Sequence, residues 1–239
     1  VSKDKSDLYL EIENPHLRYI EFYELSNNQL VLKHKCGKHM SFDSRPVDNV
    51  KFLFPINLDL NENKTFYIKI DKRTSSVSFP ITLWNQNEFT KIYNKVNLFN
   101  GVYFGGVILA ILYSFIAFFY LKRNLYLFYC FYIVFVGLYM FTSAGYAFQY
   151  LNDTMHFKSY FRVITLTLMI FFHAKFIQSL LNTKKYTKKL HLFINVVANF
   201  LVIITFFWVA LDYFDIKFVT LYLKTNYSLI LTLMICFIL

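Results

Sequence analysis

Hydrophobic and polar positions follow two different patterns along the 239-residue chain. Before residue 100, short apolar runs alternate with polar residues and turn signals, as strands of a half-buried sheet do. Beyond residue 100, the apolar runs become long and carry few charges. The pattern predicts a mixed architecture, with a β-sandwich domain over residues 1–99 and a helical transmembrane domain over residues 100–239.

Six runs in the first part have strand-like composition, and Gly, Pro, Asn or Asp residues separate them. Short strands with frequent turns are typical of a β-sandwich. We expect Leu10, Ile12, Ile20 and Phe22 to face its core. The connection over residues 85–100 has no Pro or Gly, so we expect it to be partly helical and stiff. The predicted strands span residues 8–13, 17–24, 30–34, 50–54, 65–70 and 77–83.

The second part contains five candidate membrane segments, since a spanning helix needs about 20 mostly apolar residues. The first, second and fourth have neither a charged residue nor the polar face that a soluble core helix would show. The chain starts without Met and stops inside an apolar run, so we expect a fragment of a longer protein. The segments span residues 102–121, 125–148, 160–174, 190–211 and 218–239.

Charge is distributed unevenly between the two parts. The chain has 25 Lys and Arg against 15 Asp and Glu, a net charge of +10. Residues 1–100 hold 14 basic and 12 acidic residues, whereas residues 101–239 hold 11 basic and 3 acidic ones. Because the basic excess lies in the most hydrophobic part, it indicates a membrane protein with a lipid bilayer as partner and not a nucleic-acid binder.

The loops between the membrane segments predict orientation. Basic residues and no acid occur in the loop at 122–124 and in the connection that holds Lys184, Lys185, Lys188 and Lys189. The alternate loops, 149–159 and 212–217, carry acidic residues. Cytoplasmic loops are enriched in Lys and Arg, so the lysine-rich loops are expected inside and residues 1–100 outside. The same lysines are suited to contacts with anionic lipids.

This orientation makes a direct prediction for reporter fusions. A reporter that is active only in the cytoplasm should be active when fused after Lys188 and silent when fused after Asp153. The reason is that the loops containing these two residues are expected on opposite sides of the membrane. The opposite pattern of activities would overturn the orientation.

Polar residues within the membrane segments are functional candidates by default, because burying them in lipid is costly. The basic ones can instead extend to the membrane surface, and Asn195 and Asn199, one helical turn apart, can hydrogen-bond another helix. No Asp or Glu occurs in these segments, which disfavours a proton- or cation-coupled transporter. The candidates are Arg162, His173, Lys175, Asn195, Asn199 and Lys224.

No catalytic residues, metal site or cofactor site are predicted. Cys36, Cys130 and Cys236 form no CxxC motif, and the six histidines lack metal-ligand spacing. In the first part, aromatic and Arg side chains could stack on and hydrogen-bond a sugar, with a structural role as the alternative for each. These candidate ligand-binding residues are Arg18, Tyr19, Tyr23, Arg45 and Trp84.

Several short motifs occur in an order that resembles one known family. In the first part they are Glu13-Asn14-Pro15-His16-Leu17, Ser41-Phe42-Asp43-Ser44-Arg45-Pro46, Phe54-Pro55-Ile56 and Pro80-Ile81-Thr82-Leu83-Trp84. In the second part they are Gly101-Val102-Tyr103-Phe104-Gly105, Tyr113, Tyr126, Tyr129, Gly145 and Phe148-Gln149-Tyr150-Leu151. Over essentially its whole length the chain resembles the bacterial seven-transmembrane receptors with diverse intracellular signalling modules.

This resemblance implies a jelly-roll extracellular domain of the second type, likened to carbohydrate-binding modules, and seven membrane helices, of which five are present here. It also implies a location in the bacterial cytoplasmic membrane. A cytoplasmic output module, such as a histidine kinase or cyclase, would follow, so the chain itself is not expected to be an enzyme.

We therefore expect a receptor that senses an extracytoplasmic ligand, with carbohydrate as a candidate, and relays the signal to the output module. A homodimer is left open. The alternative function is a transporter or channel subunit with an extracytoplasmic β domain.

Overall fold

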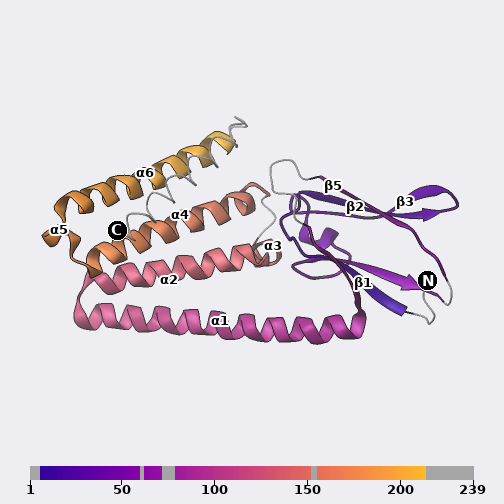
Figure 1. The fold of residues 1–239 in the computed structure, drawn as a ribbon, viewed down its shortest axis with the longest axis horizontal. Helices are drawn as coiled ribbons and strands as arrows, with labels where there is room; N and C mark the ends of the chain where they lie inside the picture. Colours follow the sequence, from indigo (N-terminus) through magenta and orange to yellow (C-terminus); the bar gives the residue numbers. More distant parts are fainter. Residues whose placement is uncertain (1–5, 60–61, 72–78, 152–154, 214–239) are drawn as a thin grey trace. The chain divides into compact units, whose positions relative to one another are not determined.

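The computed structural model describes residues 6–59, 62–71, 79–151 and 155–213 and divides the chain into two compact units. The first unit comprises residues 1–100 and 142–158, and the second comprises residues 101–141 and 159–239. One long helix, α1 (Gln86–Leu121), contributes to both (Figure 1). Each unit is described separately below.

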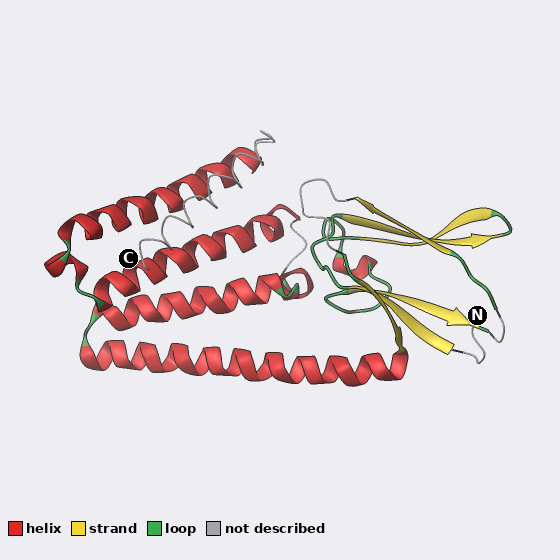
Figure 2. Cartoon of the chain, viewed as in Figure 1, coloured by secondary structure: helices red, strands yellow, loops and turns green. Residues whose placement is uncertain are grey.

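The first unit contains two three-stranded antiparallel sheets (Figure 2). All six predicted strands are present, with ends that differ by a few residues, whereas jelly-roll connectivity stays a prediction. Sheet A has the order β4 (Phe52–Leu58), β1 (Ser6–Ile12), β6 (Ile81–Asn85). Sheet B has the order β3 (Gln29–Cys36), β2 (Tyr19–Ser26), β5 (Phe66–Asp71), and a short 3₁₀ helix, η1 (Phe42–Ser44), follows β3.

The two sheets share one hydrophobic core. Ile12 and Ile20 are fully buried, Phe22 is 2% exposed, and Leu10 packs against them. Phe22 of sheet B stacks on Phe54 of sheet A, with ring centroids 4.6 Å apart. The predicted core-facing positions are thus confirmed, because side chains at every second residue of a strand point to the same face.

Helix α1 begins directly after β6, sixteen residues before the predicted membrane segment. The side-chain oxygen of Asn85 accepts the backbone N–H of Asn87 at 3.0 Å, which satisfies one of the free donors at a helix start. No Pro or Gly interrupts the helix before Gly101. The expectation of a helical connection is confirmed, and it extends over the whole of residues 86–100.

Four described helices are long and apolar enough to span a membrane, namely Gln86–Leu121, Asn124–Ser143, Tyr160–Leu180 and Lys188–Leu211. They correspond to the first four predicted segments, and the fifth, residues 218–239, lies outside the described residues. The helices themselves are α1, α2 (Asn124–Ser143), α4 (Met155–Leu180) and α6 (Lys188–Tyr213), with the short α5 (Thr183–Tyr186) before α6.

The second segment differs most from its prediction. We expected one helix to residue 148, but α2 ends at Ser143 and a separate short helix, α3 (Tyr146–Tyr150), follows. Gly145 between them has φ +93°, a conformation that other residues rarely adopt. Because the run is apolar throughout, its hydropathy carries no signal for this break. Helix α4, which corresponds to the third predicted segment, is longer than predicted and continues past Lys175 to Leu180.

In the second unit, consecutive long helices pack side by side. Phe131 and Phe135 of α2 both stack on Phe172 of α4, at 4.9 and 5.4 Å between ring centroids. Ala174 of α4 and Ala198 of α6 are almost completely buried in a cluster that joins those two helices. Small residues at such positions allow helix backbones to approach closely in a bilayer.

Candidate extracellular ligand site

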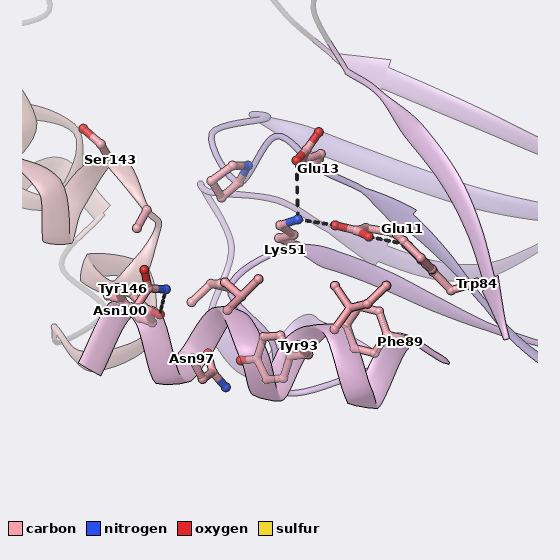
Figure 3. Close-up of a pocket in the computed structure, with 15 residues that line it drawn as sticks. Glu11, Glu13, Lys51, Trp84, Phe89, Tyr93, Asn97, Asn100, Ser143 and Tyr146 are labelled. Atoms are coloured by element: carbon pink, nitrogen blue, oxygen red, sulfur yellow. Dashed lines mark hydrogen bonds and ion pairs between the residues drawn. The ribbon is translucent and has the colours of Figure 1, made fainter. Parts of the chain in front are cut away.

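A cavity of about 300 Å³ lies within the first unit. Its walls are the face of sheet A opposite the core, the first part of α1 and the turn between α2 and α3, as Figure 3 shows. The lining residues are Glu11, Glu13, Pro15, Val50, Lys51, Trp84, Phe89, Ile92, Tyr93, Val96, Asn97, Asn100, Ser143, Ala144 and Tyr146.

Strand alternation explains why polar residues line the sheet side of this cavity. Since Leu10 and Ile12 of β1 point into the core, Tyr9 and Glu11 point to the opposite face. Helix α1 lies over this face, because Gln86 donates a hydrogen bond to the Tyr9 hydroxyl at 3.0 Å. The ring of Phe89 also meets Tyr9 edge-on, with centroids 5.5 Å apart.

Glu11 is the centre of a charged cluster in the cavity wall. Its side chain is only 6% exposed, and its two oxygens accept separate donors. The Lys51 ammonium donates to one at 2.5 Å, and the Trp84 indole N–H donates to the other. Lys51 also lies 3.5 Å from a carboxylate oxygen of Glu13 (Figure 3). A buried carboxylate needs such partners, since removing one partner of a buried ion pair costs about 3–5 kcal/mol.

The helix side of the cavity is mainly apolar and aromatic. Phe89 and Tyr93, one turn apart on α1, have stacked rings with centroids 5.6 Å apart. Ile92 and Val96 lie on the same helix and also line the cavity. This wall therefore offers aromatic rings and aliphatic groups, together with the Tyr93 hydroxyl and the amides of Asn97 and Asn100.

The turn between α2 and α3 contacts both α1 and the β domain inside the first unit. The Asn100 side chain donates to the Tyr146 hydroxyl at 2.9 Å, and the Ser143 carbonyl lies 3.2 Å from Nε2 of His16. A Cβ added at Gly145 would come within 3.0 Å of the Pro15 side chain. Larger residues at position 145 would therefore be disfavoured both by this contact and by the positive φ.

Of the five predicted ligand residues, the structure places only Trp84 in this cavity. Arg45 is buried between the rings of Phe42 and Phe52 and donates to the carbonyls of Asn49 and Val50 at 2.8 and 2.6 Å. Burial lowers the pKa of Arg45 to about 10. Its contacts indicate that it holds the loop before β4.

Tyr23 lies on sheet B, in a polar cluster with Glu21. Its hydroxyl donates to Glu21 at 2.7 Å, and this bond, together with Lys69 and Lys35, lowers the pKa of Glu21 to about 2. The carboxylate therefore favours the folded state above its usual pKa of 4.5, and that contribution is lost as the pH falls toward 2. The remaining two candidates, Arg18 and Tyr19, are neighbours whose guanidinium and ring lie 5.9 Å apart.

Comparison with known protein families agrees with this two-part organisation. Residues 1–85 match the family model described as 7TMR-DISM extracellular 2. Residues 96–239 match the family model described as 7TM diverse intracellular signalling. The chain belongs to the 7TMR-DISM family. It is accordingly a multi-pass membrane sensor with an extracellular N-terminal domain. No curated protein and no solved structure matches this 7TMR-DISM chain.

The predicted membrane residues of this 7TMR-DISM protein have different surroundings. Lys175 of α4 donates to the Asn195 side-chain oxygen of α6 at 2.6 Å, so Asn195 bonds another helix as expected, through a lysine that was instead expected to extend to the membrane surface. Asn195 in turn lies 3.0 Å from Nε2 of His191, whose Nδ1 is 2.9 Å from the Thr183 hydroxyl. These contacts connect α4, α5 and α6 near the predicted lysine-rich loop.

The other predicted membrane residues do not join this network in the described part of the 7TMR-DISM chain. His173 stacks on Tyr132 of α2, with ring centroids 4.9 Å apart. Asn199 is exposed, and the backbone carbonyl of Arg162 accepts a bond from Thr165 at 3.0 Å. Lys224 lies outside the described residues.

Sequence reasoning missed Glu11, Lys51 and the aromatic pair on α1 as site residues of this 7TMR-DISM chain. Strand alternation did signal that Glu11 lies on the non-core face of β1. The missing information was that α1 covers that face, since no sequence pattern states which sheet a connecting helix packs against.

Proposed function

We propose that this receptor lies in a bacterial cytoplasmic membrane and binds a small extracellular ligand in the cavity. Helix α1 then relays the binding event to a cytoplasmic output module. One observation carries the proposal. Helix α1 lines the cavity with residues from Phe89 to Asn100 and continues without interruption to Leu121 as a membrane-spanning helix. A ligand that contacts its first turns can therefore bias the position of its membrane part.

The strength of such a relay depends on differential affinity. A ligand shifts the receptor between two states only as far as it binds one of them more tightly, and typical couplings are about 1–3 kcal/mol. The cavity suits this requirement because its walls come from three separate elements, sheet A, α1 and the turn at 143–146. A small displacement of α1 against sheet A would change its shape.

Val96→Trp tests the cavity as the ligand site. Val96 lines the cavity and is 46% exposed, so a larger ring there should fill the cavity without unfolding the domain. Small molecules and sugars, the ligand class that the family resemblance favours, would be screened by thermal shift on the full chain in lipid nanodiscs. Ligands of the wild type should bind Val96→Trp at least about tenfold more weakly.

Leu98→Trp is the matched control for this experiment. Leu98 is two residues away on the same helix, is 68% exposed and does not line the cavity. Its variant should bind ligands as the wild type does. A ligand that binds Val96→Trp normally but is lost in Tyr23→Ala would instead place the site on sheet B.

A further inference from the structure

The cavity also indicates which chemical class of ligand it takes, an inference that rests on the proposed function. We propose that it binds a small organic cation, an ammonium group joined to an aromatic or aliphatic body. The proposal follows from the charges and aromatic rings that line the cavity and from the exposure of the Glu13 carboxylate.

Acidic groups outnumber basic ones in the lining. Glu11 and Glu13 face a single cation, Lys51. Both oxygens of Glu11 already accept hydrogen bonds from Lys51 and Trp84, so Glu11 has little capacity to accept one from a ligand. Glu13 differs, because it is 58% exposed and lies 3.5 Å from Lys51, farther than the 2.5 Å that separates Lys51 from Glu11. A carboxylate has about four acceptor positions, so Glu13 retains capacity for a second ammonium.

The aromatic side chains favour the same class of ligand. Trp84, Phe89 and Tyr93 all line the cavity, and the faces of such rings attract an ammonium group within about 6 Å. Ile92 and Val96 provide aliphatic contacts for the uncharged body of the ligand. A carboxylate and ring faces together are the usual means by which proteins hold an organic ammonium.

The lining disfavours the competing ligand classes. An anion would meet the acidic excess, and Lys51 is already paired with Glu11. A sugar needs many hydrogen-bond partners, but the Trp84 N–H and the Asn100 amide already donate to protein atoms. The α1 wall therefore offers a sugar mainly the Tyr93 hydroxyl and the Asn97 amide. The volume of about 300 Å³ lies at the small end of ligand cavities and suits one ring with a short amine chain.

Four probes of similar or matched size distinguish these classes. They are 2-phenylethylamine, its neutral analogue 2-phenylethanol, the anion 3-phenylpropanoate, and glucose. The full chain in nanodiscs of neutral lipid would carry Trp208→Phe, so that Trp84 is the remaining tryptophan of the two and its fluorescence reports on the cavity. We expect the amine to change this fluorescence saturably at the lowest concentration of the four.

Glu13→Gln identifies the contact, and Glu88→Gln is its control. Glu13 is exposed, so the variant should fold, and amine binding should weaken by about tenfold while phenylethanol binding stays unchanged. Glu88 is equally exposed on α1 but does not line the cavity, so its variant should bind the amine normally.

Each other outcome overturns the inference. Stronger binding of phenylethanol, phenylpropanoate or glucose, sensitive to Val96→Trp, would reject the cation while leaving the cavity as the sensing site. Amine binding that Glu13→Gln does not weaken would reject the assigned contact. A third outcome is that a screened ligand binds in the cavity, as judged by its sensitivity to Val96→Trp, while the amine gives no response. That result would reject the organic cation as the ligand class and leave the cavity as the sensing site.

Discussion

Replacing Ile12 by Asp is expected to unfold the extracellular β domain. Ile12 is fully buried between the two sheets, where a carboxylate would have no partner. Core substitutions that bury an unpaired charge are among the most destabilising known, exceeding about 4 kcal/mol, against a total stability of about 5–15 kcal/mol for typical domains. Phe22→Asp should have the same effect, because Phe22 stacks on both Phe54 and Phe66.

Limited proteolysis of the full chain in nanodiscs measures this effect. Both variants should be cleaved throughout the first unit under conditions in which the wild type resists. The control is Leu30→Asp, since Leu30 is 55% exposed on β3 and surface changes usually alter stability by less than about 0.5 kcal/mol. Protease resistance of Ile12→Asp equal to that of the control would refute the assignment of Ile12 to the core.

The strands and their core could be predicted from the sequence, because alternate residues of a strand point to opposite faces of its sheet. Ile12, Ile20 and Phe22 could be placed on the core side without knowing the pairing of strands. The register, in which Tyr9 lies opposite Trp84, depends on contacts between residues far apart in the chain. Hydropathy in turn located the four described membrane helices, since length and apolar composition alone decide whether a helix can span a bilayer.

The candidate site was harder to predict from the sequence, because it too depends on contacts between residues far apart in the chain. Arg45 has the chemistry of a ligand-binding residue, but the rings of Phe42 and Phe52 enclose it. Glu11, conversely, has the sequence pattern of an exposed strand residue, but α1 covers its face of the sheet. Residue type and spacing identify what a side chain can do, whereas packing decides whether it is free to do it.

The double substitution Leu98→Gly/Phe99→Gly in α1 is expected to cause a loss of signal transfer. These residues are 68% and 64% exposed, lie outside the cavity lining and precede Gly101 in α1. Each Gly in a helix interior costs about 1 kcal/mol relative to Ala, so the pair weakens α1 by about 2 kcal/mol at this point. That penalty is comparable to a typical allosteric coupling of about 1–3 kcal/mol.

Leu98→Ala/Phe99→Ala provides the matched control, because it removes the same side chains and keeps the helix. A dye attached through Arg123→Cys, beyond the far end of α1, would report ligand binding. The native Cys36 and Cys130 are buried, and Cys236 would be replaced by Ser. The Ala variant should retain the ligand-induced change in dye emission, and the Gly variant should lose most of it while still binding ligand.

The result also separates two routes out of the β domain. Besides α1, the turn between α2 and α3 contacts this domain through His16 and Ser143, and Gln149 donates to Asp48 at 3.1 Å. If α1 is the route, weakening its helix at residues 98–99 reduces the coupling between the ligand and the dye. An undiminished response in the Gly variant would contradict the α1 relay and assign the signal to the turn, where Ser143→Pro and Gly145→Val would then be expected to abolish it.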